Sequence, residues 1–181
     1  VPTATVIASI NQSLLKDLSA LLSNHYFKVF FSEDLFGVQA CGALKNVIAL
    51  FVGIAAGAGY KHENTKAYLL TQGFAELAQL TVALGGEKET VYGLSGLGDL
   101  LLTCSSMLSK NLRVGKLIGK GLRLEQIQTK HFAVLPEGIA TLRALNELML
   151  QHKLDLPLCR GAYACVFGDA SIKDIFTDLW K

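Results

Sequence analysis

The apolar stretch from Leu35 to Tyr60 constrains the fold of this chain more than any other segment. A helix formed by it is apolar on nearly every face, which is typical of a buried central helix or of a membrane span. The polar pair Lys45-Asn46 interrupts the stretch and leaves about fourteen apolar residues after it, short of the ~20 that a bilayer requires. We therefore predict a central core helix and no membrane span.

Helical periodicity continues through the rest of the chain. The central helix is predicted from about Phe36 to the glycines at 57 and 59, and Ser171 and Asp174 have the spacing of a capping box. Further helices are predicted near 64–84, 99–105, 111–119, 123–129, 137–151, 157–167 and from 171 onward. This part of the chain is predicted to be a compact multi-helix bundle.

The first part of the chain has a different pattern. Two short runs rich in β-branched and aromatic residues, 5–10 and 26–31, suit strands, and a leucine stripe after Asn11 suits a helix between them. The chain is thus mainly α, with a short β-α-β unit in front of the bundle. We place a domain boundary near Phe36, which divides the chain into 1–36 and 37–181.

Composition excludes several classes of function. Apolar residues make up 51% of the chain and the net charge is only +2, so neither disorder nor general attraction to nucleic acid is expected. The four cysteines and four histidines show no zinc-like spacing; we predict reduced, buried thiols and no metal. The first residues carry no signal-peptide pattern, so we expect a cytoplasmic protein whose sequence here starts inside a longer chain.

Lys45 lies in the sequence Gly42-Ala-Leu-Lys-Asn46, and no carboxylate lies within one helical turn of it. Burial of an ammonium group favours its neutral form, so a lysine in an apolar helix can donate and accept protons near neutral pH. The plainer alternative is a lysine that reaches solvent from a helix end. Asn46 beside it favours the functional interpretation slightly.

A second motif runs from Gly93 through Gly98 and Asp99 to Thr103. In a helix, Asp99 and Thr103 lie four residues apart on one face, where the carboxylate can pair with a buried lysine. The glycines would let backbone approach a small ligand, but they lack the spacing of a dinucleotide fingerprint. The alternative is that Asp99 is only a helix N-cap.

A third motif, Ser109-Lys110-Asn111, precedes a predicted helix. Free backbone N–H groups and the helix dipole favour an anion there, and the side chains add hydrogen bonds and charge. The corner therefore suits a phosphate group. The alternative is an ordinary solvated and capped helix start.

In order and spacing, Gly42 to Asn46, Leu94 to Cys104, and Pro136-Glu137-Gly138 before a helix resemble the NAD(P)-dependent glycerol-3-phosphate dehydrogenase family. The resemblance covers most of the chain. It implies a helical domain like the C-terminal domain of 6-phosphogluconate dehydrogenase. The β-α-β unit would then be the end of a Rossmann dinucleotide-binding domain whose glycine-rich fingerprint lies upstream of Val1.

The resemblance implies interconversion of dihydroxyacetone phosphate and sn-glycerol 3-phosphate for glycerophospholipid synthesis. Lys45 would be the acid/base residue at the C2 oxygen, with Asp99 orienting it and Thr103 supporting the same site. The implied substrate-binding residues are Lys45, Asp99, Ser109, Lys110 and Asn111, and the implied cofactor-binding residues are Lys110, Leu135 and Glu137. NAD or NADP would be bound mainly by the upstream domain, so this chain alone is expected to be inactive. Homodimerisation is left open.

One residue departs from the family pattern, which usually has Ser-Arg-Asn where this chain has Ser109-Lys110-Asn111. Lysine keeps the charge but loses the planar bidentate fork of arginine. Two other functions stay open on the sequence: the helical domain of another phosphosugar or hydroxyacid dehydrogenase, and a non-catalytic helical module that binds anions or a partner.

Overall fold

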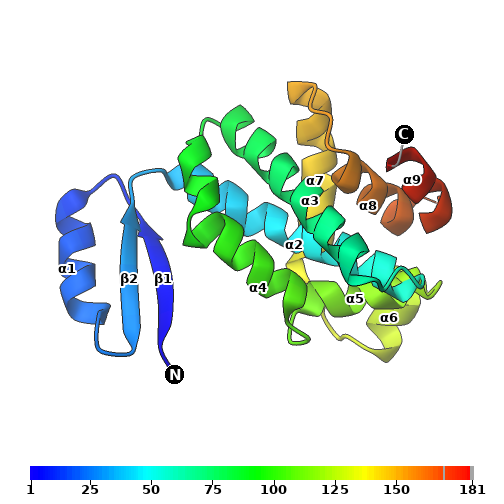
Figure 1. Ribbon diagram of the computed structural model, residues 1–181, viewed down its shortest axis with the longest axis horizontal. Coiled ribbons are helices and arrows are strands. Elements are labelled where there is room, and N and C mark those ends of the chain that lie inside the picture. The colour runs from blue at the N-terminus through cyan, green and yellow to red at the C-terminus, as the bar shows by residue number, and fades with distance from the viewer. Residues whose placement is uncertain (169, 180–181) are drawn as a thin grey trace.

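The chain begins with a β-α-β unit, seen at the left of Figure 1. Its elements are β1 (Thr3–Ala8), α1 (Gln12–Leu22) and β2 (Phe27–Ser32). The two strands are parallel, with Thr3 opposite Phe27. Asn11 begins α1, because its side chain accepts a hydrogen bond from the backbone N–H of Leu14 at 3.1 Å. The predicted strand-helix-strand order is confirmed in this computed structural model, which describes residues 1–168 and 170–179.

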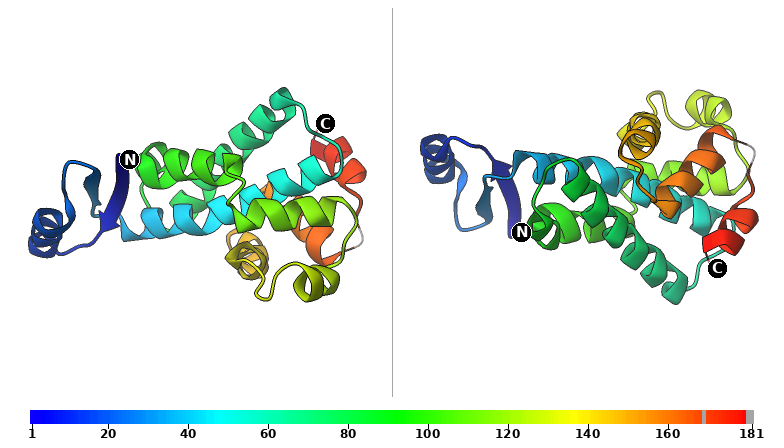
Figure 2. Two further views of the ribbon diagram at one scale, coloured as in Figure 1. Left: turned by 90° about the horizontal axis from the view of Figure 1, so that it is seen from below. Right: turned by 90° about the horizontal axis from the view of Figure 1, so that it is seen from above.

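Helices make up the rest of the described chain and form a separate body (Figure 2). They are α2 (Leu35–Gly57), α3 (Glu63–Ala83), α4 (Asp99–Ser105), α5 (Lys110–Gly119), α6 (Leu124–Lys130), α7 (Glu137–His152), α8 (Pro157–Phe167) and α9 (Ile172–Leu179). The predicted helices agree with these bounds to within about two residues. The mainly helical bundle behind a β-α-β unit is therefore confirmed.

Two short segments between α3 and α4 were not predicted: a 3₁₀ helix, η1 (Lys88–Tyr92), and a single π turn, η2 (Leu94–Gly98). Such short turns carry no 3.6-residue pattern that a sequence could display. The glycine at 96 is required here, because a Cβ on Gly96 would lie 2.0 Å from the carbonyl oxygen of Val91. Its missing side chain therefore serves the packing of η2 on η1, not the approach of a ligand.

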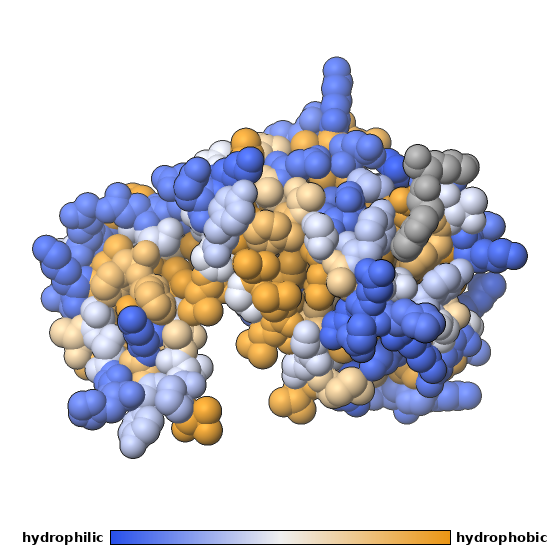
Figure 3. Space-filling view, in the orientation of Figure 1, coloured by the Kyte–Doolittle hydropathy of each residue, from blue (hydrophilic) through white to orange (hydrophobic). Residues whose placement is uncertain are grey.

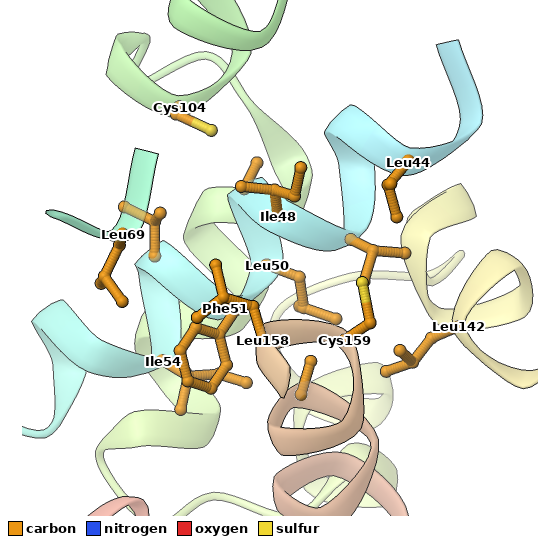
Figure 4. Close-up of a cluster of buried hydrophobic side chains, with 14 of the residues drawn as sticks. Leu44, Ile48, Leu50, Phe51, Ile54, Leu69, Cys104, Leu142, Leu158 and Cys159 are labelled. Carbon is orange, nitrogen blue, oxygen red and sulfur yellow. The ribbon is translucent and has the colours of Figure 1, made fainter. Parts of the chain in front are cut away.

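The core of the body is built around α2. Residues 47 to 55 of this helix are all buried, and helices α3, α4, α5, α7 and α8 pack around it. Figure 4 shows Leu158 of α8 beside Phe51 of α2, and Cys159 of α8 between Leu50 of α2 and Leu142 of α7. The prediction of a central buried helix is confirmed.

By length and composition alone, α2 is the one helix in the described part of the chain that could cross a membrane. Lys45 lies within this helix, as the predicted range from about Phe36 to the glycines at 57 and 59 requires. However, 67% of its most apolar window is buried inside this structure. A buried core helix can have this length and composition without crossing a membrane.

Helices α2 and α5 run side by side in unusually close contact. A Cβ on Gly53 would lie 2.3 Å from the carbonyl oxygen of Leu112, and one on Gly115 would lie 2.0 Å from that of Leu50. Side chains at these positions would overlap the backbone of the neighbouring helix. The glycines therefore set the distance between the two helices.

Asp34 joins the start of α2 to η1. Its carboxylate accepts hydrogen bonds from the backbone N–H groups of Gly37 (2.7 Å) and Glu87 (2.8 Å) and from the hydroxyl of Thr90 (2.6 Å). Burial raises the pKa of Asp34, but these three hydrogen bonds outweigh it and hold the pKa below the usual 3.8.

Glu76 of α3 plays a similar part at the start of α8. Its two carboxylate oxygens accept hydrogen bonds from the backbone N–H groups of Leu158 (2.7 Å) and Cys159 (3.1 Å). Here burial dominates and raises the pKa of Glu76 above the usual 4.5, with the hydrogen bonds offsetting only part of the effect. Neither carboxylate was singled out from the sequence.

The remaining local predictions concern the cysteines and the last helix. All four cysteines are free thiols; three are buried and Cys165 is half-buried. At the start of α9, the backbone N–H of Asp174 donates to the Ser171 hydroxyl at 3.2 Å, which in turn donates to the Asp174 carboxylate at 2.6 Å. The first half of the predicted capping box is present, and its second half is replaced by this contact between side chains.

Candidate active site

Lys45 and Asp99 form an ion pair between α2 and α4, although 54 residues separate them in the sequence. The other oxygen of the Asp99 carboxylate accepts a hydrogen bond from the hydroxyl of Thr103 at 3.4 Å, one turn further along α4. The carboxylate is thus held from both sides. The structure brings these three predicted catalytic residues together in one cluster.

This arrangement differs from both of the plainer alternatives. Lys45 lies in the middle of α2, not at a helix end, and its side chain is 21% exposed. Asp99 is the first residue of α4 and makes no capping hydrogen bond, because its carboxylate turns toward Lys45. The pair is only partly buried, so the Lys45 ammonium has a fixed partner and remains within reach of a solute.

Asn46 connects this pair to a second group of polar residues. Its side-chain oxygen accepts a hydrogen bond at 2.9 Å from the amide of Asn111 on α5. The oxygen of Asn111 in turn accepts one at 3.1 Å from the backbone N–H of Gly138, at the start of α7. A Cβ on Gly138 would lie 2.4 Å from that Asn111 oxygen, so a side chain there would displace the Asn111 amide.

The start of α5 is held by Ser109, whose hydroxyl accepts a hydrogen bond from the backbone N–H of Leu112 at 3.3 Å. The capped helix start predicted as the alternative is therefore present. Lys110 follows it and is exposed, whereas Asn111 is buried. The corner presents one cation and a helix N-terminus beside the amide of Asn111, an arrangement that favours an anion.

The two other predicted residues stand just before and at the first turn of α7. Leu135 is half-buried against the core and Glu137 is exposed. The Asn111–Gly138 hydrogen bond brings this turn next to the start of α5. Among residues 1–168 and 170–179, no ion pair joins Lys110 or Glu137 to the Lys45–Asp99 pair. They lie at the edge of the cluster.

A cavity of about 340 Å³ adjoins the ion pair, between β1 and the helical body. Asp99 and Gly98 line it from the body, Gly42 from α2, and Thr5 from β1. In Figure 3 apolar side chains gather on the surface over α4 near this cavity. A small polar solute in the cavity would meet the Asp99 carboxylate, to which the Lys45 ammonium is paired.

Two functional features were missed or undervalued by sequence reasoning. Asn46 was noted only as a neighbour of Lys45, and it is the link between the two polar groups. The backbone N–H of Gly138 was not considered at all. One signal was available: Lys45 and Asn46 are adjacent polar residues in an otherwise apolar helix.

The sequence matches the family model described as NAD-dependent glycerol-3-phosphate dehydrogenase C-terminus over residues 34–177. A curated relative from Syntrophomonas wolfei, a glycerol-3-phosphate dehydrogenase of the NAD(P)+ type, is 40% identical over 181 residues, which is 100% of this chain and 52% of the relative. One from a Thermoanaerobacter species is 41% identical over 167 residues, 92% of this chain and 50% of the relative. The chain spans about half the length of the curated relatives it matches.

Solved structures give the same result. The glycerol-3-phosphate dehydrogenase of Coxiella burnetii superposes with a TM-score of 0.93 at 32% identity and covers 100% of this chain and 55% of its own. The enzyme from Saccharomyces cerevisiae gives a TM-score of 0.87 at 26% identity, covering 99% of this chain and 55% of its own.

Proposed function

This chain belongs to the family of NAD-dependent glycerol-3-phosphate dehydrogenases, and from this premise we propose that the whole protein interconverts dihydroxyacetone phosphate and sn-glycerol 3-phosphate with NAD or NADP. In this proposal residues 37–181 bind the substrate and carry the catalytic lysine, and residues 1–36 end the dinucleotide-binding domain. The ion pair between Lys45 and Asp99, beside a cavity and joined to α5 through Asn46, is the observation that carries it.

Lys45 is the proposed catalytic acid and base. During reduction it donates a proton to the C2 oxygen of the substrate, and during oxidation it takes that proton back. When bound, the nicotinamide supplies or removes the hydride at C2. The half-buried position of Lys45 supports this role, since the ammonium has one carboxylate partner and still borders open space.

Asp99 and Thr103 position Lys45, and Asp99 also binds the substrate hydroxyl groups. The contact of each Asp99 oxygen with one of these side chains supports this assignment. Ser109, Lys110 and Asn111 take the phosphate end of the substrate at the start of α5, where the helix dipole and the Lys110 charge favour an anion. Lysine provides charge there without the fork geometry of arginine.

The chain contributes only an edge of the cofactor site. Lys110, Leu135 and Glu137 stand at two helix starts that a hydrogen bond holds together, which suits them to contact one side of a nicotinamide. Three residues cannot hold a dinucleotide, and the sequence contains no Gly-x-Gly-x-x-Gly motif. We therefore propose that this chain by itself does not turn over. The whole protein is proposed to work in the cytoplasm and to serve glycerophospholipid synthesis.

The test uses the full-length protein, its Lys45→Met variant and a matched control, Lys130→Met, which changes an exposed lysine on α6. Oxidation of NADH and NADPH is followed with dihydroxyacetone phosphate as substrate. We expect Lys45→Met to lower kcat about 10³-fold, a typical loss for a general acid. The control is expected to stay within twofold, and the 181-residue chain to show no turnover.

Other outcomes would assign the site differently. If the full-length protein were active and Lys45→Met kept its rate within a few-fold, Lys45 would not be the acid. If it were inactive with dihydroxyacetone phosphate and active with a 2-hydroxy acid, the substrate would belong to another class. Binding of glycerol 3-phosphate without turnover would indicate an anion-binding module.

A further inference from the structure

A second cavity, of about 350 Å³, lies at the end of α2 that is remote from Lys45. Gly57, which borders it, follows Lys45 by twelve residues, or roughly 18 Å along the helix. Four lysines from three segments surround it, and no aspartate or glutamate of the described chain lines it. We call it the lysine cavity; its lysines are Lys61, Lys66, Lys116 and Lys120.

These four lysines have no acidic partners among residues 1–168 and 170–179, where the ion pairs are Lys45–Asp99 and Arg160–Asp155. The Lys116 ammonium meets the sulfur of Met107 at 3.3 Å, a weak acceptor. The cluster thus gathers twice the net charge of the whole chain, +2, around one cavity. In Figure 3 hydrophilic side chains gather on this face, over the start of α3 and the end of α5.

Helix dipoles neutralise only a small part of the positive charge of the four lysines. The C-termini of α2 and α5 lie beside the cavity and contribute about −0.5 charge each, whereas the N-terminus of α3 contributes about +0.5. The backbone therefore offsets only about half a charge of the four. Lys66 lies near the N-terminus of α3, where the dipole disfavours a cation. Most of the positive charge of the four lysines is therefore left for a bound anion to neutralise.

The scaffold around the cavity is rigid. A Cβ on Gly57 would lie 2.2 Å from the carbonyl oxygen of Lys116, so the ends of α2 and α5 are in backbone contact. Tyr60 is stacked on Phe176 with 4.2 Å between ring centroids. Packing therefore holds in place the segments that carry Lys61, Lys116 and Lys120. A backbone held in place lowers the entropic cost of gathering the lysine side chains around an anion.

We propose that the lysine cavity binds a compact oligoanion, a di- or triphosphate group, at a site separate from the candidate active site. Lysines bind phosphates as point charges, and four of them match the roughly four negative charges of a triphosphate. Val52, Ala56 and Leu69 form an apolar wall of the cavity. This wall excludes water from one side of a bound anion, which strengthens the attraction between the anion and the lysines. The volume lies at the lower end of the range for small-molecule sites.

The test is isothermal titration calorimetry of the 181-residue chain with inorganic triphosphate, at low and at physiological salt. The test variant carries Lys66→Gln and Lys120→Gln, and the matched control carries Lys16→Gln and Lys130→Gln, exposed lysines away from the cavity with the same change of net charge. We expect saturable binding with one site per chain, weakened about tenfold in the test variant and less than twofold in the control. Salt should weaken it as well.

Folding is checked by circular dichroism, and Lys61→Gln in the loop before α3 replaces the test variant if the double change unfolds the chain. A charge-conserving variant, Lys66→Arg with Lys120→Arg, should keep binding within about threefold. The absence of saturable binding, or an equal loss in test and control variants, would overturn the proposal. Binding to vesicles containing phosphatidylserine without any binding of triphosphate would also overturn it and would indicate a membrane contact.

Discussion

In its C-terminal half α2 packs against α5 backbone to backbone, whereas at its midpoint the same two helices are joined by the side chains of Asn46 and Asn111. Gly53 allows the close contact, and no side chain lies between the helices at that point. The close contact between Gly53 and Leu112, which we call the anchor, fixes the distance between α2 and α5 and so the distance between Asn46 and Asn111.

The comparison shows how an apolar contact can position a polar site. Two amides form a 2.9 Å hydrogen bond only if their helices stay at one distance, and glycines fix that distance more strictly than flexible side chains would. Substitutions at Gly53, Asn111, Asp34, Glu76 and Ser109 test this relationship.

Gly53→Ala should break the anchor. The new Cβ would lie 2.3 Å from the carbonyl oxygen of Leu112, a backbone atom that can move only with its helix. We expect the free energy of unfolding in urea to fall by about 3 kcal/mol, the upper range for overpacking. Gly42→Ala is the matched control in the same helix, because a Cβ there has nothing within 4 Å. That change should be neutral or stabilise by up to about 1 kcal/mol, and equal losses would contradict the anchor.

Asn111→Ala should remove the side-chain hydrogen bond that joins α2 to α5. It removes the partner of the buried Gly138 N–H and of Asn46, so we expect a loss of about 2 kcal/mol in urea unfolding. A double-mutant cycle with Asn46→Ala isolates the hydrogen bond between the helices and should give a coupling of about 1 kcal/mol. Coupling near zero would mean that the two amides are neighbours without an energetic link.

Asp34→Asn tests the cap that begins α2. The folded-state pKa of Asp34 lies below 3.8, so its contribution to stability is complete above the unfolded-state pKa and is lost as pH falls through the folded-state value. At pH 7 we expect the variant to unfold about 1.5 kcal/mol more easily, because an amide cannot accept all three hydrogen bonds. The difference should shrink as pH approaches 3.

Glu76→Gln provides a control of opposite sign. The folded-state pKa of Glu76 is raised, so protonated Glu76 suits the folded state better than ionised Glu76 does. Its contribution to stability is complete below the unfolded-state pKa near 4.5 and is lost as pH rises through the folded-state pKa. The variant has no such titration and should gain stability relative to the wild type as pH rises. Parallel pH profiles for the two variants would contradict the assigned directions.

Ser109→Ala is the smallest change, because it removes one hydrogen bond at the start of α5. We expect a loss of about 1 kcal/mol, and Ser109→Asp should retain most of the stability because it can still cap the helix. In the full-length protein the alanine variant should also raise KM for dihydroxyacetone phosphate, since Ser109 is proposed to bind the substrate. An effect on stability with an unchanged KM would leave Ser109 as a cap only.

The site could be predicted in part from the sequence. Lys45, Asp99 and Thr103 stood out because each is a polar residue in an apolar segment, and helical spacing placed Asp99 and Thr103 on one face. Asn46 and Gly138 could not be assigned in this way, because their partners lie on other helices. The lysine cavity was missed for the same reason, since its four lysines come from the loop after α2, from α3, from α5 and from the residue that follows α5.

Local patterns in the sequence indicate where most of the helices and strands lie and which polar residues stand out in apolar segments, because hydrophobic periodicity, caps and glycines act over a few residues. Which residues meet depends on how the helices pack: Lys45 with Asp99, Asn46 with Asn111, and Asp34 with Thr90. Those contacts depend on the distances and crossing angles of packed helices. These are set by contacts between distant segments such as Gly53 and Leu112, and no local pattern records them.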